Sequence, residues 1–307
     1  AHEIETWSPN GESCVWVKVP ALMKDTAFLM YYNGTSETTV TSADTWSAYT
    51  GVWHMDELDG DVADATGHGL TAKPMGAAAS KQSSTDGVCG KARINSSSTA
   101  AGDKAYLNVP SYDDFNLGST FTMSGWVKMS ACTSYPRIFS RKANWGDANG
   151  WEIEMKSGSM TDFQARGAAQ EHLAATFPPA LNAGFSQVVF VYNDKTLDVY
   201  QNGVLLKSGA ITAATDNGKS LSFGSDSDGN ETHIAGTFDE FRLADGCASA
   251  DRIRADYDQL AVGGAAFLTA SAALEVATDE PVLARPEATA SFETAEVRTS
   301  LRLVGEG

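Results

Sequence analysis

The sequence has little positive charge: 22 lysine and arginine residues stand against 39 aspartate and glutamate residues, for a formal net charge of −17. Binding to nucleic acid needs concentrated positive charge to displace the counterions of the phosphates. Attachment to an anionic membrane surface needs it too. The composition therefore argues against nucleic acid and anionic membranes as partners, and it suits a soluble acidic protein that tolerates divalent cations.

Long apolar runs are also missing. No stretch approaches the roughly 20 apolar residues that a membrane-spanning helix needs, so we expect no membrane insertion. The first ten residues, AHEIETWSPN, have neither a basic start nor an apolar run, so they do not form a signal peptide and instead read as the middle of a domain. We therefore expect the chain to be one part of a longer protein.

Cysteine is scarce, and no zinc-type spacing occurs. The four cysteines are far apart and form no CxxC pair: Cys14, Cys89, Cys132 and Cys247. Widely spaced cysteines in a chain rich in threonine, serine and glycine favour an exported protein, extracellular or on the cell surface, with one or two disulfides. Four cysteines allow three pairings, and the sequence does not choose among them. Four buried free thiols are the alternative.

Short alternating runs dominate the chain instead, and hydrophobic residues make up 42% of it, which is enough for a sizeable core. Turn sequences such as NDKT, QNG and DNGK separate these runs. About a dozen short strands at this spacing predict an all-β sandwich or barrel. The expected strands lie within 15–20, 27–34, 51–57, 105–110, 121–129, 137–142, 150–158, 187–194, 197–209, 221–226 and 236–246.

One helix is expected over 249–262. Ser249 is its N-cap, and Ile253, Tyr257 and Leu260 form an apolar stripe at helical spacing. Just before it, alternation in GTFDEFRLADG predicts Phe238, Glu240 and Arg242 on one face of a strand, with Asp239, Phe241 and Leu243 on the other.

The order of the segments carries a resemblance. GVWHMDE, DATGHG, GVCGKARI, FTMSGWVK, the LDVYQNGVLLKSG hairpin and FDEFRL followed by a helix are similar to laminin G-like, concanavalin A-like domains of bacterial surface proteins. The resemblance covers about residues 51 to 260 and implies a jelly-roll sandwich of two antiparallel sheets. Two features depart from the pattern: the cysteines at 89, 132 and 247, and the loose segment at 90–109 that lacks an F-D-G turn.

The resemblance also divides the chain. The runs at 15–20 and 27–34 look like an antiparallel pair, and the N-terminal part resembles the end of a small bacterial domain of unknown function. After residue 262 the composition turns to alanine, glycine and threonine with prolines, as in a linker. We expect a partial N-terminal β domain at 1–50, the sandwich with one short helix at 51–262, a linker at 263–290, and the start of a truncated β domain or a tail at 291–307.

The acidic stretch GVWHMDELDGDVADATGHG at 51–69 raises the question of a metal site. It contains no H-E-x-x-H motif and no complete EF-hand loop, and it is best interpreted as a strand followed by a turn in which Asp64 caps its own backbone. The alternative is a structural calcium ion, which similar sandwich domains hold near the opening turn and the closing D-E strand. Its ligands would be Asp64 and Asp239, with Asp226 and Asp228 as lesser candidates. Without calcium, we expect Asp239 to pair with Arg242 or a backbone amide.

One predicted strand, at 150–158, contains two carboxylates that can be compared with a known catalytic motif. Family-16 glycoside hydrolases share the sandwich fold and carry E-x-D-x-E on one strand. Here Glu152 and Glu154 occupy alternate positions, but Lys156 stands where the third acid belongs. A solvent-exposed strand face is the favoured interpretation of this pair, so we assign no catalytic residue.

A ligand site is better indicated around Trp145. Sugar sites use an aromatic face that packs on the ring C–H groups, flanked by polar side chains. Trp145 lies in a turn rich in glycine and asparagine, where its own strand cannot bury it, whereas Trp126 and Trp151 lie in alternating strands and should be core. The flanking candidates are Arg141, Lys142, Asn144, Asp147 and Asn149, with Tyr135 as a weaker one.

These observations favour a non-catalytic carbohydrate-binding or adhesive module of an exported multidomain bacterial protein. Its partners would be a glycan or a cell-surface or matrix ligand, together with neighbouring domains of the longer chain. Two alternatives stay open: a structural spacer of a surface protein, and a glycoside hydrolase on the same fold.

Overall fold

The computed structural model describes residues 1–8, 12–19, 42–110, 117–212, 218–229 and 233–261, and the backbone of short strands at 30–32, 268–270, 282–284, 286–288 and 297–304. The chain divides into two compact units, which are described separately. One unit comprises Ala1–Thr45 and Ala255–Gly307, and the other comprises Trp46–Arg254.

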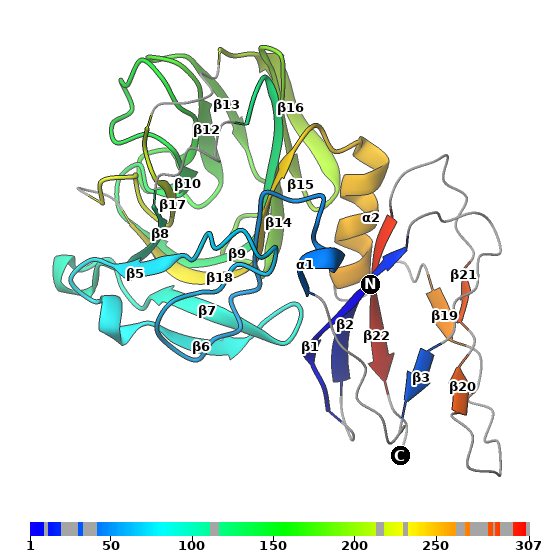
Figure 1. Cartoon of the computed structure of the whole chain (residues 1–307). Coiled ribbons are helices and arrows are strands. Elements are labelled where there is room, and N and C mark those ends of the chain that lie inside the picture. The colour runs from blue at the N-terminus through cyan, green and yellow to red at the C-terminus, as the bar shows by residue number, and fades with distance from the viewer. Residues whose placement is uncertain are drawn as a thin grey trace. The chain divides into compact units, whose positions relative to one another are not determined.

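The unit Trp46–Arg254 contains two large antiparallel sheets (Figure 1). The first sheet has the order β13 (His172–Thr176), β12 (Asp162–Arg166), β11 (Glu152–Met155), β10 (Arg137–Ser140), β17 (Leu221–Phe223), β8 (Tyr106–Val109) and β5 (Lys73–Met75). The second has the order β16 (Val204–Ala210), β15 (Thr196–Gln201), β14 (Ser186–Asn193), β9 (Thr120–Cys132), β18 (Ile234–Asp245), β7 (Lys91–Ser96) and β6 (Ser83–Asp86), with β4 (Gly51–Trp53) also paired to β18. Two 3₁₀ turns complete the unit, η1 (Ala79–Lys81) and η2 (Ala101–Asp103).

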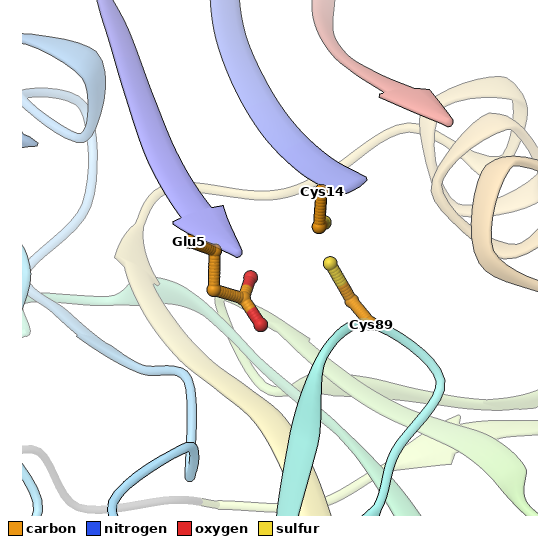
Figure 2. Close-up of side chains that lie close together, drawn as sticks. All are labelled: Glu5, Cys14 and Cys89. Carbon is orange, nitrogen blue, oxygen red and sulfur yellow. The ribbon is translucent and has the colours of Figure 1, made fainter. Parts of the chain in front are cut away.

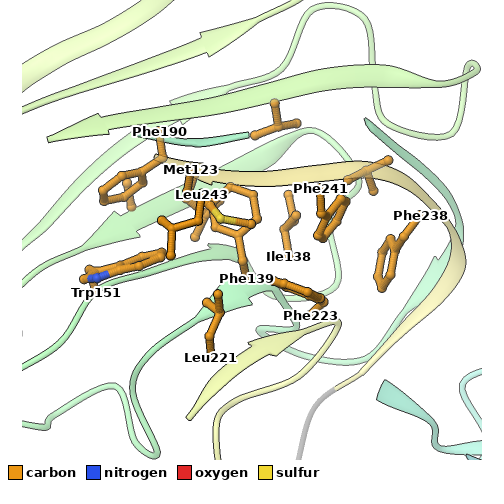
Figure 3. Packing of buried hydrophobic residues seen from close by; sticks show 14 of the residues in the cluster. Met123, Ile138, Phe139, Trp151, Phe190, Leu221, Phe223, Phe238, Phe241 and Leu243 are labelled. Atoms are coloured by element: carbon orange, nitrogen blue, oxygen red, sulfur yellow. The ribbon is translucent and has the colours of Figure 1, made fainter. Parts of the chain in front are cut away.

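Side chains from both sheets meet in one hydrophobic core, which is rich in aromatic rings (Figure 3). Trp151 lies 4.7 Å from the Phe121 ring and 5.4 Å from the Phe190 ring, measured between centroids. Phe223 and Phe241 meet edge to face at 4.8 Å, a favoured geometry for aromatic pairs. The expected sandwich with a sizeable core is therefore confirmed, and side chains that alternate with these core positions in the first sheet point away from it.

The predicted alternation fails within β18. Phe238 and Phe241 are both in the core, although three positions apart in a strand should place them on opposite faces. The pairing of β18 with β9 shifts register between Asp239 and Arg242, and Glu240 has a φ of +51°. This is a β-bulge, in which one extra residue re-aims the side chains that follow it. The bulge returns Phe241 to the core. It also directs the Glu240 side chain toward His54 and Arg242, with which it is buried.

Most predicted strands of this unit are present, and the helix is α2 (Ala250–Leu260). Ser249 caps it as expected, because its hydroxyl accepts a hydrogen bond from the Arg252 amide at 3.2 Å. Within this unit Ile253 packs against Val189, Val191 and Tyr200 on the face of the second sheet opposite the core.

The other unit contains three small sheets. β2 (Glu12–Val19) lies between β1 (His2–Thr6) and β22 (Val297–Val304), β3 (Met30–Tyr32) pairs with β20 (Val282–Ala284), and β19 (Leu268–Ala270) pairs with β21 (Pro286–Ala288). A one-turn helix, α1 (Ser42–Thr45), contacts β1 and β2. The expected pairing of 15–20 with 27–34 is wrong for the described residues, since β3 pairs with β20 instead. Residues 27–29 and 33–34 lie outside the described part.

The cysteines fall into two kinds. Cys14 and Cys89 are disulfide-bonded, and Figure 2 draws their side chains together with that of Glu5. Cys132 and Cys247 are free thiols. The expectation of one or two disulfides is thus met by one. Within the described residues, none of the helices has the length and apolar character needed to cross a membrane.

Candidate functional site

Asp64 uses its carboxylate to fasten the turn that it begins. Its oxygens accept hydrogen bonds from the amides of Val52 at 3.1 Å, Thr66 at 3.0 Å and Leu70 at 3.2 Å. The Thr66 hydroxyl donates to the same carboxylate at 2.7 Å. These donors join the end of β4 to the turn at 64–70, so the acidic stretch forms a strand and a capped turn.

The other calcium candidates lie in separate surroundings. Asp239 is buried at the β18 bulge and accepts a hydrogen bond from the Val88 amide at 2.6 Å. Asp226 is buried in the loop after β17, and Asp228 in the same loop lies 3.9 Å from the Lys219 ammonium. In the described part of the chain, no three of these four aspartates bring oxygen atoms within 4.8 Å of one another. A calcium ion therefore stays a prediction.

Glu152 and Glu154 are buried, so the expectation of a solvent-exposed strand face is wrong. Both project from β11 on the side opposite the core, and they are 0% and 1% exposed. The cause is the register of the neighbouring strands. Arg137 on β10 stands opposite Glu154, and Arg166 on β12 stands opposite Glu152, so long cationic side chains cover the acids.

These four side chains form an ion network, which we call the β11 charge cluster. Arg137 Nε lies 3.1 Å from Glu152 Oε2, and its Nη2 lies 3.7 Å from Glu154 Oε2. Arg166 Nε donates to Glu154 Oε1, and its Nη2 donates to Gln164 Oε1 at 2.6 Å. The second oxygen of Glu152, Oε1, accepts no hydrogen bond within the described residues and lies 3.9 Å from Arg166 Nε.

Burial shifts the pKa values in and beside the cluster. It raises the pKa of Glu154, and the nearby charge of Glu152 raises it further. Burial also lowers the pKa of Lys142, which is 0% exposed. The Lys142 ammonium donates to the carbonyls of Gly167 at 2.7 Å and Ala169 at 2.9 Å. Lys142 thus ties the loop after β10 to the turn after β12.

Trp145 stands exposed on the loop after β10, with 44% of its surface accessible. The loop is fixed by its own polar side chains. Asp147 Oδ2 accepts from the amides of Ala143 at 2.9 Å and Asn144 at 3.1 Å, and Asn144 Oδ1 accepts from the Gly146 amide at 2.9 Å. The Arg166 guanidinium lies 5.5 Å from the Trp145 ring centroid, within cation–π range. An exposed aromatic ring is therefore held next to the β11 charge cluster.

The remaining predicted ligand residues are placed differently. Arg141 is buried, and its guanidinium donates to the Lys219 carbonyl at 2.9 Å, so it serves the fold. Asn149 is exposed on the same loop as Trp145. Tyr135 is 40% exposed in the turn before β10, with a φ of +51°. Trp126 and Trp151 are buried, as expected.

Sequence reasoning missed Arg137, Gln164 and Arg166. The signal for two of them was the alternation of Asp162, Gln164 and Arg166 in TDFQAR, which mirrors WEIEM across one turn. It was overlooked because the following segment, GAAQEHLAAT, is short of the β-branched residues that usually mark a strand. That segment nevertheless contains β13.

With this fold and site in view, the comparisons with known proteins define the class. The profile of the concanavalin A-like lectin/glucanases superfamily, in its laminin G form, matches residues 101–254, half of the chain. The chain belongs to this superfamily. A search of the curated proteins found no match.

Solved toxin domains share this fold at low sequence identity. The binding domain of Paraclostridial Mosquitocidal Protein 1 has a TM-score of 0.50 and 13% identity, covering 71% of this chain and 52% of that one. The binding domain of Botulinum Neurotoxin DC in complex with SialylT has a TM-score of 0.51 and 14% identity, covering 72% and 52%. Domain 4 of AbnA, a GH43 extracellular arabinanase from Geobacillus stearothermophilus in complex with arabinotriose, gives 0.49 and 19%, covering 67% and 97%. The chain thus spans about half of each toxin domain.

Proposed function

We propose that this protein is a non-catalytic carbohydrate-binding module that holds a glycan against Trp145. The observation that carries the proposal is the exposed Trp145 ring on a loop whose Asn144 and Asp147 side chains hydrogen-bond to the loop's own amides. A flat indole packs on the C–H face of a sugar ring, and a loop that is already ordered loses little entropy when the sugar binds. The Arg166 guanidinium, in cation–π contact with the indole, further limits the conformations of the Trp145 side chain.

The superfamily includes lectins and glucanases, so it supports a role in carbohydrate recognition but leaves binding and hydrolysis as alternatives. The toxin domains share only the fold with this chain. The ion network favours binding over hydrolysis. A glycosidase needs one carboxyl that donates a proton and another that reaches the anomeric carbon or a water. Glu152 and Glu154 are instead buried and paired with Arg137 and Arg166.

We also propose that the protein is exported and acts outside the cell, at a surface or in a matrix. The bonded cysteines Cys14 and Cys89 support this, because stable disulfides belong mainly to oxidising compartments. A spacer role remains the alternative, and it predicts no specific ligand.

The test is a glycan array followed by isothermal titration with the best oligosaccharide. We expect binding at micromolar to submillimolar affinity. Trp145→Ala should weaken it at least tenfold, because a side chain that stacks on a nucleic-acid base contributes on the order of 1–3 kcal/mol and the indole face would stack on the sugar in a comparable way.

The matched control is Trp7→Ala, which removes a tryptophan of similar exposure, 49%, from another part of the chain and should leave the affinity unchanged. Full affinity in Trp145→Ala would refute the site. An array without any binder, using folded protein with and without calcium, would favour the spacer.

A further inference from the structure

The charges beside Trp145 indicate the class of glycan. We propose that the site takes an uncharged glycan and rejects uronic, sialic and sulfated sugars, an inference that rests on the proposed function. An acidic sugar needs a cation whose charge is not already used, because carboxylate and sulfate groups are recognised by charge-assisted hydrogen bonds. Every lysine and arginine in the β11 charge cluster and the Trp145 loop already donates to a carboxylate or a backbone carbonyl of the protein.

Arg166 is the cation that lies against Trp145, and it is matched on both sides. Its Nε donates to Glu154, and its Nη2 donates to the Gln164 amide oxygen. Glu152 adds a second negative charge 3.9 Å from the Arg166 Nε atom. An incoming sugar carboxylate would therefore meet a guanidinium that is already neutralised, with two buried carboxylates behind it.

The remaining cations are occupied as well. Arg141, at the start of the Trp145 loop, is buried and donates to the Lys219 carbonyl at 2.9 Å. Arg137 pairs with Glu152 at 3.1 Å and with Glu154 at 3.7 Å. Lys142 is buried and donates to the backbone carbonyls of Gly167 and Ala169. Neither Arg137 nor Lys142 can turn toward a ligand without leaving a buried group without its partner, which is costly.

The local charges balance. Four cations, Arg137, Arg141, Lys142 and Arg166, stand with four carboxylates, Asp147, Glu152, Glu154 and Asp226. The charges of Asp147, Glu152 and Glu154 act on Lys142, and that of Asp226 acts on Arg137. The whole chain carries a net charge of −17, which repels polyanions at long range. Hydroxyl groups have no such penalty, since they can accept from the side-chain amide of exposed Asn144.

The test compares neutral with acidic polysaccharides on one native affinity gel and by titration. Arabinan, galactan, xylan and β-glucan form the neutral set, and polygalacturonate, alginate and heparan sulfate form the acidic set. We expect retardation only within the neutral set, with a Kd that changes less than twofold between 20 and 150 mM salt, because no counterions are exchanged.

A second experiment looks for a gain of binding to acidic oligosaccharides. Glu154→Gln keeps the shape of the side chain but leaves Arg166 without its carboxylate beneath Trp145, so acidic oligosaccharides should now bind at least tenfold tighter than to the unchanged protein, in a salt-sensitive way. The control is Asp86→Asn, the same change in net charge at an exposed position on β6, which should give no gain. Circular dichroism checks that both variants fold. If Glu154→Gln does not fold, the comparison of neutral with acidic polysaccharides on the unchanged protein tests the inference by itself.

The outcomes separate the two proposals. Tight binding of acidic glycans by the unchanged protein, lost in Trp145→Ala, would overturn the charge inference while leaving the binding function intact. Binding of neutral glycans alone, lost in Trp145→Ala, supports both. Absence of binding to every polysaccharide would overturn both.

Discussion

Glu240 shows how neighbouring side chains stabilise a buried charge in this protein. It sits at the β18 bulge, 2% exposed, with its Oε1 2.6 Å from His54 Nδ1 and its Oε2 bonded to the Arg242 guanidinium. Arg242 in turn lies 4.9 Å from the Trp46 ring centroid. Of the two partners expected for Asp239, Arg242 or a backbone amide, the structure gives the Val88 amide, and Arg242 bonds to Glu240 at the bulge.

The Glu240 pair predicts loss of stability in acid. Burial alone would raise the pKa of Glu240, but the charges and hydrogen bonds of His54 and Arg242 lower it from 4.5 to about 2. Because the folded-state pKa lies below the unfolded value, the stabilisation is present above pH 4.5 and is lost as the pH falls toward 2, by roughly 3 kcal/mol in all. Denaturant titrations of the wild type and Glu240→Gln from pH 6 to pH 2.5 measure it.

The variant should be less stable than the wild type at pH 6, and this difference should shrink steadily as the pH falls below 4.5. A difference that stays constant down to pH 2.5 would contradict the low pKa of Glu240.

Single residues also show which features of the candidate site the sequence could predict. Trp145 could be predicted as exposed, because a tryptophan among glycine, asparagine and aspartate has no strand to bury it. Its contact with Arg166 could not be predicted, because it depends on the register between β11 and β12 and on where the loop after β10 folds back. The burial of Glu152 has the same origin.

At the scale of elements, alternation located the strongly patterned strands such as β9, β14 and β18. It failed where the pattern was weak or interrupted. β12 and β13 were missed because DFQAR and HLAAT contain few of the β-branched residues that mark a strand. Both are held by pairing with neighbouring strands, which the local sequence does not specify. The bulge in β18 inverted the predicted face of its second half, since one extra residue reverses the period of two.

The contact between β9 and β18 gives a prediction about packing. Gly125 on β9 lies under the ring of Phe241, and a Cβ at this position would overlap that ring. Phe241 cannot withdraw, because Phe139, Phe223 and Phe238 surround it. Gly125→Ala should therefore cost about 1–3 kcal/mol and lower the Tm by several degrees in a calorimetric scan.

Gly184→Ala is the matched control, because nothing lies within 4 Å of the added methyl group and the backbone is compatible with alanine. We expect its Tm to equal that of the wild type or exceed it slightly. Equal melting temperatures for the two variants would show that the core at Phe241 adapts without cost.

At the scale of the molecule, the sandwich uses the inner faces of its sheets for the aromatic core and leaves the outer face of β10–β13 to polar groups. There the charges cancel locally, while the chain as a whole stays strongly acidic. Strand patterning over some two hundred residues predicted a sandwich or a barrel, and the resemblance in the order of the segments implied the jelly-roll sandwich. The particular ligand is not written in that patterning, since it depends on one loop and its neighbours.

The measurement that tests the central claim most directly is nuclear magnetic resonance of the tryptophan indole groups in ¹⁵N-labelled protein. The oligosaccharide found by the array is titrated in, and the Trp145 signal is assigned by its disappearance in Trp145→Phe. The account predicts a saturable shift of the Trp145 signal, while the signals of buried Trp53 and Trp126 stay in place. An unmoved Trp145 signal during titration to saturation, with shifts elsewhere in the chain, would contradict it.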